Sequence, residues 1–118
     1  MILLVDDQAD VRFMISLYLE DEGVDFDEAS SGEEAVAAAT SKAYDLVLLD
    51  QRMPPGPSGI EVAEQLRAAG RELPIVLYSA YLDPAVEERA RKLGLRTVDK
   101  GEPDRLMEAL RLELPPAS

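Results

Sequence analysis

The chain opens with ILLVDDQADV, residues 2–11, in which four apolar residues run directly into two carboxylates. A short, continuous apolar run is typical of a strand that is covered on both faces. Residues 9–22 then carry apolar side chains at helical spacing and stop at Gly23, which predicts a helix. The stretch therefore indicates a strand followed by a helix, with Asp6 and Asp7 at the junction.

The same strand–helix unit recurs along the whole chain. The predicted strands are residues 1–5, 24–29, 46–49, 74–78 and 96–98. The predicted helices are residues 9–22, 31–41, 58–69, 84–93 and 103–114. Such alternation with short connections predicts an α/β sandwich around a parallel sheet. The length of 118 residues predicts a single domain over residues 1–118.

Composition excludes several classes of function. With 24 acidic and 12 basic residues the net charge is −12, which argues against direct binding to a nucleic-acid backbone. The absence of Cys and His excludes disulfides, Cys/His zinc sites and a histidine general base. The sequence contains no apolar run long enough to span a membrane. We therefore expect a cytoplasmic protein that does not contact the membrane.

Side chains that can bind a cation or a phosphate follow four of the five predicted strands. Asp6 and Asp7 follow the first, Asp50 the third, Ser79 the fourth and Lys100 the fifth. Ligands of an open parallel sheet bind beyond the carboxyl ends of its strands, where the strand order reverses. If the order is 2-1-3-4-5, the three carboxylates meet at the reversal, and the serine and lysine flank the third of them.

Three carboxylates in one crevice repel, so the pKa of at least one should rise unless a cation is present. Hard oxygen ligands in small number favour Mg²⁺, with Mn²⁺ as the alternative. A carboxylate can also attack phosphorus and form an aspartyl phosphate. Each residue alone has a plainer interpretation, as a helix cap, a turn residue or a surface lysine. Their shared position at strand ends favours a site.

Four segments resemble the receiver domain of bacterial two-component response regulators. They are ILLVDDQADVR, YDLVLLDQRMPPGPSGIEV, LPIVLYSAY and ARKLGLRTVDKG. The separations of 29 residues from Asp50 to Ser79 and 21 from Ser79 to Lys100 are similar to those of the family. The resemblance covers essentially the whole chain. It implies a flavodoxin-like, doubly wound (βα)5 three-layer sandwich with a five-stranded parallel sheet in the order 2-1-3-4-5.

The resemblance also implies roles for the phosphoryl chemistry. Asp50 would be the phosphoacceptor, taking the phosphoryl group from a sensor histidine kinase or a histidine phosphotransfer protein. Ser79 and Lys100 would contact the phosphoryl group. The domain would catalyse its own phosphorylation and, slowly, its own dephosphorylation. It would not be a conventional metabolic enzyme.

A metal site is implied by the same resemblance. Asp7 would bind Mg²⁺ directly, together with Asp50, and Asp6 would reach the ion mainly through water. Arg52 would contribute its main-chain carbonyl.

Three features depart from the family pattern. Gly101 follows the lysine where the family usually has proline, and Thr97 replaces the aromatic residue that usually rotates in the switch. The segment of residues 54–59 is one residue longer than usual. Tyr81 is a candidate substitute for the missing aromatic, beside Ser79 in the switch; alternatively it is a half-buried or partner-contacting tyrosine.

Two other functions stay open at this point. A pseudo-receiver would keep the fold as a protein-binding scaffold, which Gly101 and Thr97 favour and the three carboxylates disfavour. An α/β phosphohydrolase with an aspartate nucleophile would usually carry a second aspartate at position 52, and Arg52 argues against it.

The resemblance implies that the domain passes on its signal by binding another protein. The family often docks an effector or a second copy through the fourth helix, fifth strand and fifth helix, here residues 87–92 and 105–111, although their mixed charges also suit a solvated surface. The chain could act as a single-domain regulator or be one domain of a longer protein.

Overall fold

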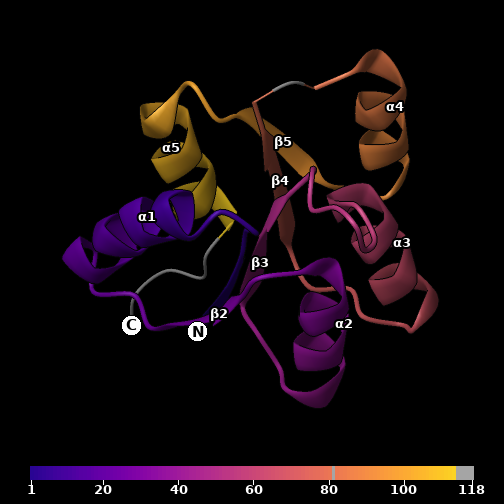
Figure 1. Ribbon diagram of the computed structural model, residues 1–118, viewed down its shortest axis with the longest axis horizontal. Helices are drawn as coiled ribbons and strands as arrows, with labels where there is room; N and C mark the ends of the chain where they lie inside the picture. Colours follow the sequence, from indigo (N-terminus) through magenta and orange to yellow (C-terminus); the bar gives the residue numbers. More distant parts are fainter. Residues whose placement is uncertain (81, 114–118) are drawn as a thin grey trace.

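The computed structural model describes residues 1–80 and 82–113, which form a five-stranded parallel sheet with helices on both faces (Figure 1). The strands are β1 (Ile2–Val5), β2 (Phe26–Ala29), β3 (Leu46–Asp50), β4 (Ile75–Ser79) and β5 (Arg96–Asp99). The helices are α1 (Ala9–Asp21), α2 (Gly32–Ser41), α3 (Gly59–Ala68), α4 (Pro84–Lys92) and α5 (Pro103–Glu113). The sheet order is β2-β1-β3-β4-β5, so the predicted fold class and strand order are confirmed.

Two apolar layers hold the helices to the sheet. Figure 1 shows α1 and α5 on one side and α2, α3 and α4 on the other. Because side chains alternate along a strand, neighbouring residues of β1 and β3 enter opposite layers. Every residue of both strands is buried, which explains their continuous apolar sequence. Each buried Leu or Ile contributes roughly 2 kcal/mol of transfer free energy to this core.

The second strand begins later than predicted, at Phe26 rather than at residue 24. The backbone N–H of Val24 donates to the carbonyl of Leu19 at 2.9 Å, so this residue closes the end of α1. Gly23 allows that closure because its φ of 73° is a conformation that side chains disfavour. Val24 therefore belongs to the end of α1, and its apolar side chain packs against the core layer on the α1 and α5 side of the sheet.

Three strands extend one residue further than predicted, to Asp50, Ser79 and Asp99. Strand pairing uses only backbone groups, so a polar side chain does not end it. Asp50 is paired with Tyr78, and Ser79 with Asp99. Two of the predicted site residues therefore belong to the sheet itself rather than to flexible loops.

Polar side chains cap the starts of α3 and α4. Ser58 and Glu61 form a capping box at α3, in which each side chain accepts a hydrogen bond from the other residue's backbone N–H. Asp83 caps α4, with Pro84 at its first position. The predicted end of the last helix at Leu114 lies outside the described residues.

The helices of residues 1–80 and 82–113 are short. The longest, α1, has 13 residues, whereas a membrane-spanning helix needs about 20 apolar ones. None of these helices combines the length and apolar character needed to cross a bilayer.

Candidate functional site: an acidic crevice beyond β1 and β3

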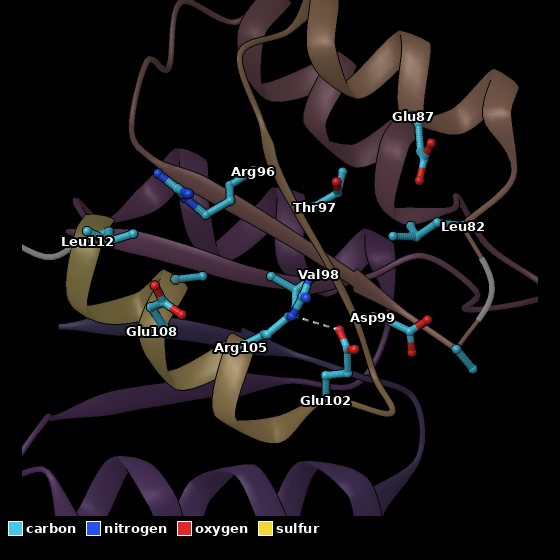
Figure 2. Close-up of a pocket in the computed structure, with 12 residues that line it drawn as sticks. Leu82, Glu87, Arg96, Thr97, Val98, Asp99, Glu102, Arg105, Glu108 and Leu112 are labelled. Atoms are coloured by element: carbon cyan, nitrogen blue, oxygen red, sulfur yellow. Dashed lines mark ion pairs between the residues drawn. The ribbon is translucent and has the colours of Figure 1, made fainter.

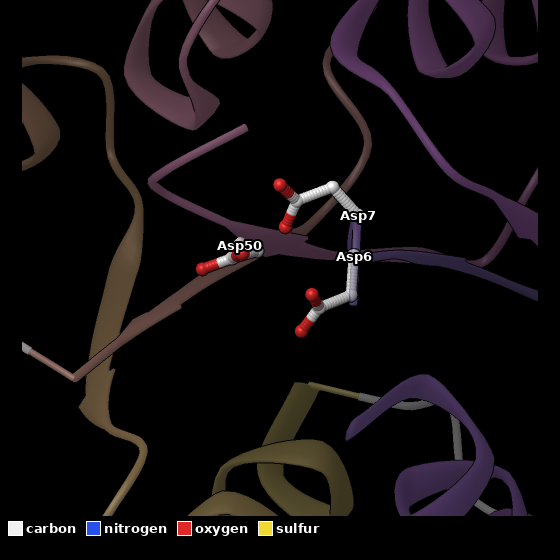
Figure 3. Close-up of side chains that lie close together, drawn as sticks. All are labelled: Asp6, Asp7 and Asp50. Carbon is white, nitrogen blue, oxygen red and sulfur yellow. The ribbon is translucent and has the colours of Figure 1, made fainter. Parts of the chain in front are cut away.

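Three carboxylates meet at the carboxyl ends of two neighbouring inner strands, β1 and β3. Asp6 and Asp7 directly follow β1, and Asp50 ends β3; one oxygen of each lies within 4.8 Å of the others. Figure 3 shows the side chains of Asp6 and Asp7 leaving the chain on opposite sides, with Asp50 beside them on β3. This divergence is the ordinary alternation of an extended backbone. The structure therefore brings together the residues that the sequence placed at one edge.

The two neighbouring acids have very different surroundings. Asp6 is fully buried, and its Oδ1 accepts the backbone N–H of Gln8 at 2.9 Å. Its Oδ2 accepts the hydroxyl of Tyr78 at 2.9 Å and lies 3.1 Å from Nζ of Lys100. Asp7 is exposed, and within the part of the chain that the structure describes its carboxylate has no hydrogen bond or ion pair. Asp7 therefore presents the carboxylate that is most available to a cation.

Lys100 neutralises part of this acidic charge. Its Nζ lies 3.1 Å from Asp6 Oδ2 and 3.1 Å from Asp50 Oδ1, so one ammonium bridges β1 and β3. The same atom lies 5.1 Å from the ring centre of Tyr78, within cation–π range. The backbone N–H of Lys100 donates to the carbonyl of Ser79 at 2.8 Å, which places the lysine at the end of the sheet.

The electrostatics of the crevice act most strongly on Asp50, whose side chain is buried. The pKa of its carboxyl is raised from the usual 3.8 to about 6, because burial and then repulsion by Asp6 raise it more than Lys100 lowers it. Asp50 is therefore mainly ionised at neutral pH. Its ionisation is nonetheless opposed by the surroundings.

The remaining predicted residues are less fully placed. Ser79 is buried at the end of β4, beside the crevice, and Arg52 is exposed two residues after Asp50. Tyr81 lies outside the described residues, so its predicted role in the switch remains a prediction. Gly101 donates its backbone N–H to Asp99 Oδ1 at 2.7 Å. Proline, which the family usually has there, lacks that N–H.

Sequence reasoning missed residues that support the site. Gln51 accepts the backbone N–H of Gly59 on its carbonyl at 2.9 Å and that of Ile60 on its side chain at 2.8 Å. These bonds pin the start of α3 to the end of β3. A Cβ on Gly59 would lie 2.3 Å from the carbonyl oxygen of Asp50, so only glycine fits there. Tyr78 lies in a strand whose other residues before Ser79 are apolar, so the sequence indicated only a core residue. The signal for a role in the site was a polar hydroxyl one residue before the end of that strand.

A hollow of about 720 Å³ lies over β5, between α4 and α5. Figure 2 shows Thr97 and Val98 on its floor and the Glu102–Arg105 ion pair, 3.2 Å long, on the α5 side. The short side chain of Thr97 stands where the family usually has an aromatic ring. This is the face at which the family resemblance predicts partner docking.

Comparisons with known proteins agree with this geometry. The family model described as the response regulator receiver domain matches residues 2–111. The transcriptional regulatory protein ResD of Bacillus subtilis is 46% identical over 79 residues, 67% of this chain and 32% of ResD. The chain thus spans about a third of the length of ResD. Sporulation initiation phosphotransferase F of Bacillus subtilis is 30% identical over 96 residues, covering 81% of this chain and 77% of that protein.

Solved structures show the same fold. The crystal structure of the response regulator TrrA from Thermotoga maritima, in complex with Mg²⁺-BeF, has a TM-score of 0.85 and 35% identity, covering 96% of this chain and 97% of that one. The chemotaxis protein CheY4 of Vibrio cholerae has a TM-score of 0.85 and 27% identity, covering 96% and 97%. From the strand order, the acidic crevice and these matches together, the chain belongs to the response regulator receiver domains of two-component signalling.

Proposed function

We propose that the chain accepts a phosphoryl group on Asp50 from the phosphohistidine of a sensor histidine kinase or histidine phosphotransfer protein. The observation that carries this proposal is the meeting of Asp50 with two further carboxylates and the Lys100 ammonium in one crevice. A similar receiver, TrrA, has been crystallised with Mg²⁺-BeF, which supports a metal-assisted site.

The donor set fits a hard divalent cation, with Mg²⁺ proposed and Mn²⁺ as the alternative. Asp7 would bind the ion directly with Asp50, because its exposed carboxylate has no other partner among the described residues. Asp6 would act mainly through water, because its oxygens already accept three donors. The main-chain carbonyl of Arg52 would complete the protein ligands. When bound, the ion would offset the charge of the carboxylates and the phosphoryl oxygens.

The transfer itself is carried by side chains. One carboxylate oxygen of Asp50 forms a bond to phosphorus while the N–P bond of phosphohistidine breaks and its electron pair stays with the imidazole. Lys100 turns from the carboxylates to the phosphoryl oxygens, and Ser79 contributes its hydroxyl. Later attack by water on phosphorus releases phosphate and restores the carboxylate.

The first test uses the unmodified chain. Incubation with Mg²⁺ and acetyl phosphate is expected to add one phosphoryl group, seen by intact-mass spectrometry, and EDTA is expected to prevent it. Beryllofluoride should raise the melting temperature only when Mg²⁺ is present. A chain that gives neither response would be a phosphorylation-independent scaffold, and the proposal would be rejected.

Asp7 and Asp6 are expected to contribute unequally to metal binding. Asp7→Ala should abolish Mg²⁺ binding because it removes a direct ligand. Asp6→Ala should weaken binding roughly 10–100-fold, the range typical of groups that act behind the ligands. Isothermal titration calorimetry measures both dissociation constants, and equal losses would contradict this division of roles.

Signal output would follow from partner binding. We propose the face of α4, β5 and α5, with its hollow over Thr97, as the docking surface for an effector protein or a second copy. Phosphorylation at Asp50 would change that face through Ser79 and Tyr81. Because Thr97 has no aromatic ring, Tyr81 would take the role of the usual aromatic arm.

A further inference from the structure

Tyr78 is a buried tyrosine whose hydroxyl reaches the acidic crevice from β4. Its side chain is 0% exposed and packs with the apolar residues on the α1 and α5 side of the sheet. Because β3 lies between β4 and β1, the side chain extends past the whole width of β3. Its hydroxyl oxygen lies 2.9 Å from Asp6 Oδ2 and 3.2 Å from the carbonyl oxygen of Val5. Its single proton favours the carboxylate, because hydrogen bonds to a charged acceptor are stronger.

The backbone of Asp6 is already fixed by other contacts. Its N–H donates to the carbonyl of Ala29 at 3.2 Å, and its own carbonyl accepts Nη1 of Arg12 at 2.6 Å. Its Oδ1 is held locally by the N–H of Gln8. What remains to be fixed is the orientation of Oδ2, and two donors, Tyr78 and Lys100, share that atom.

The two donors on Oδ2 differ in permanence. Lys100 is divided between Asp6 and Asp50, and the proposed function requires it to turn toward an incoming phosphoryl group. The hydroxyl of Tyr78 has no such second task, and its ring is locked in the core. When the lysine leaves, Tyr78 is the side chain that still holds this oxygen.

We propose that Tyr78 is a positioning residue: its hydroxyl keeps the buried carboxylate of Asp6 oriented toward the cation site independently of Lys100. This inference rests on the proposed function, since it assigns Tyr78 a role in the same metal and phosphoryl site. Groups that hydrogen-bond to metal-site carboxylates typically change metal affinity 10–100-fold when they are removed.

The chain offers a matched control in Tyr44. This largely buried tyrosine also donates its hydroxyl to an aspartate, Asp27, at 2.6 Å, but Asp27 lies in β2, outside the crevice. Tyr78→Phe and Tyr44→Phe therefore remove the same kind of bond and keep the same ring. Both variants are expected to melt at a lower temperature than the parent chain in EDTA.

Titration with MgCl₂ by calorimetry separates positioning from mere stabilisation. Tyr78→Phe is expected to weaken Mg²⁺ binding about tenfold, and Tyr44→Phe to leave the dissociation constant within twofold of the parent value. A third variant, Lys100→Met, is expected to bind Mg²⁺ at least as tightly as the parent, because it removes a positive charge from the crevice. It tests the same point without altering the buried ring.

The possible outcomes distinguish failure of the positioning role of Tyr78 from failure of the proposed function. If the parent binds Mg²⁺ and Tyr78→Phe binds it equally well or more tightly, the positioning role is wrong and the proposed function stands. If Lys100→Met weakens Mg²⁺ binding tenfold, the lysine rather than the tyrosine orients Asp6, and the inference also fails. If the parent itself does not bind Mg²⁺, the proposed function fails and this inference fails with it.

Discussion

Asp50→Asn is expected to abolish formation of the phosphoryl adduct and, in the metal-free protein, to increase the free energy of unfolding. The first effect follows because an amide cannot supply the carboxylate oxygen that bonds to phosphorus. The second follows because the crevice opposes ionisation of this residue, with burial as the largest cause and repulsion by Asp6 next. Intact-mass spectrometry after acetyl phosphate treatment measures the first, and denaturant unfolding in EDTA the second.

The pH dependence gives the sign and size of the stabilisation. The pKa of Asp50 is raised from 3.8 to about 6 in the folded protein, so its favourable contribution is complete below pH 3.8 and is lost as the pH rises through 6. At about 1.4 kcal/mol per pKa unit, the cost of ionisation at pH 7 is about 3 kcal/mol. Asp50→Asn removes that cost, so the difference between the two proteins should be near zero at pH 4 and largest above pH 7.

A control separates this effect from a general response to lost charge. Asp25 is an exposed aspartate that precedes β2, at the other end of the sheet. Asp25→Asn should change the free energy of unfolding by less than about 0.5 kcal/mol at every pH. If the Asp50→Asn protein is no more stable than the parent at pH 7, ionisation of Asp50 does not destabilise the folded protein and the prediction is wrong.

Gly59→Ala is expected to destabilise the protein by roughly 3 kcal/mol, the upper part of the usual cost of overpacking. An added Cβ would lie 2.3 Å from the carbonyl oxygen of Asp50 and 2.7 Å from Leu77, both within the packed core. Alanine favours helices over glycine by only about 1 kcal/mol, so the clash outweighs this gain. The clash also pushes on the residue that carries the proposed nucleophile, so Mg²⁺ binding should weaken together with stability.

Gly56, in the loop that precedes α3, provides the comparison. A Cβ there would meet Glu33 at 3.5 Å, an ordinary contact. Gly56→Ala should therefore change the free energy of unfolding by less than about 0.5 kcal/mol. Equal effects of the two substitutions in chemical denaturation would mean that close packing against Asp50 is not what requires glycine at position 59.

The architecture was predictable because its causes are local. Continuous apolar runs identified β1, β3 and β4, which are buried on both faces. The error at the start of β2 arose because Val24 packs its apolar side chain against the core while its backbone N–H closes the end of α1. The strand order came from the family resemblance rather than from periodicity, because hydrophobic pattern alone does not say which strands are neighbours.

The candidate site was predictable only in part. Asp6, Asp7, Asp50, Ser79 and Lys100 could be nominated, since polar residues at strand ends stand out against apolar runs. The different burial and hydrogen-bond partners of these residues could not be predicted from the sequence, because they depend on contacts between distant segments. The hydroxyl of Tyr78 comes to Asp6 from 72 positions along the chain. The requirement for glycine at position 59 likewise appears only when α3 is packed against β3.

Because β1 and β3 are inner strands of the sheet, the two sides of the site differ in their dynamics. Strands buried on both faces open only when the domain unfolds as a whole, whereas edge segments open locally at lower free energy. The carboxylates stand at the ends of the inner strands β1 and β3, and Lys100 follows the edge strand β5. The crevice therefore joins two parts that differ in local stability. The ends of β1 and β3, which carry the carboxylates, open only with global unfolding, whereas the end of β5, which carries Lys100, can open locally. Any rearrangement triggered there costs least if it spreads outward through β5, leaving the carboxylates in place.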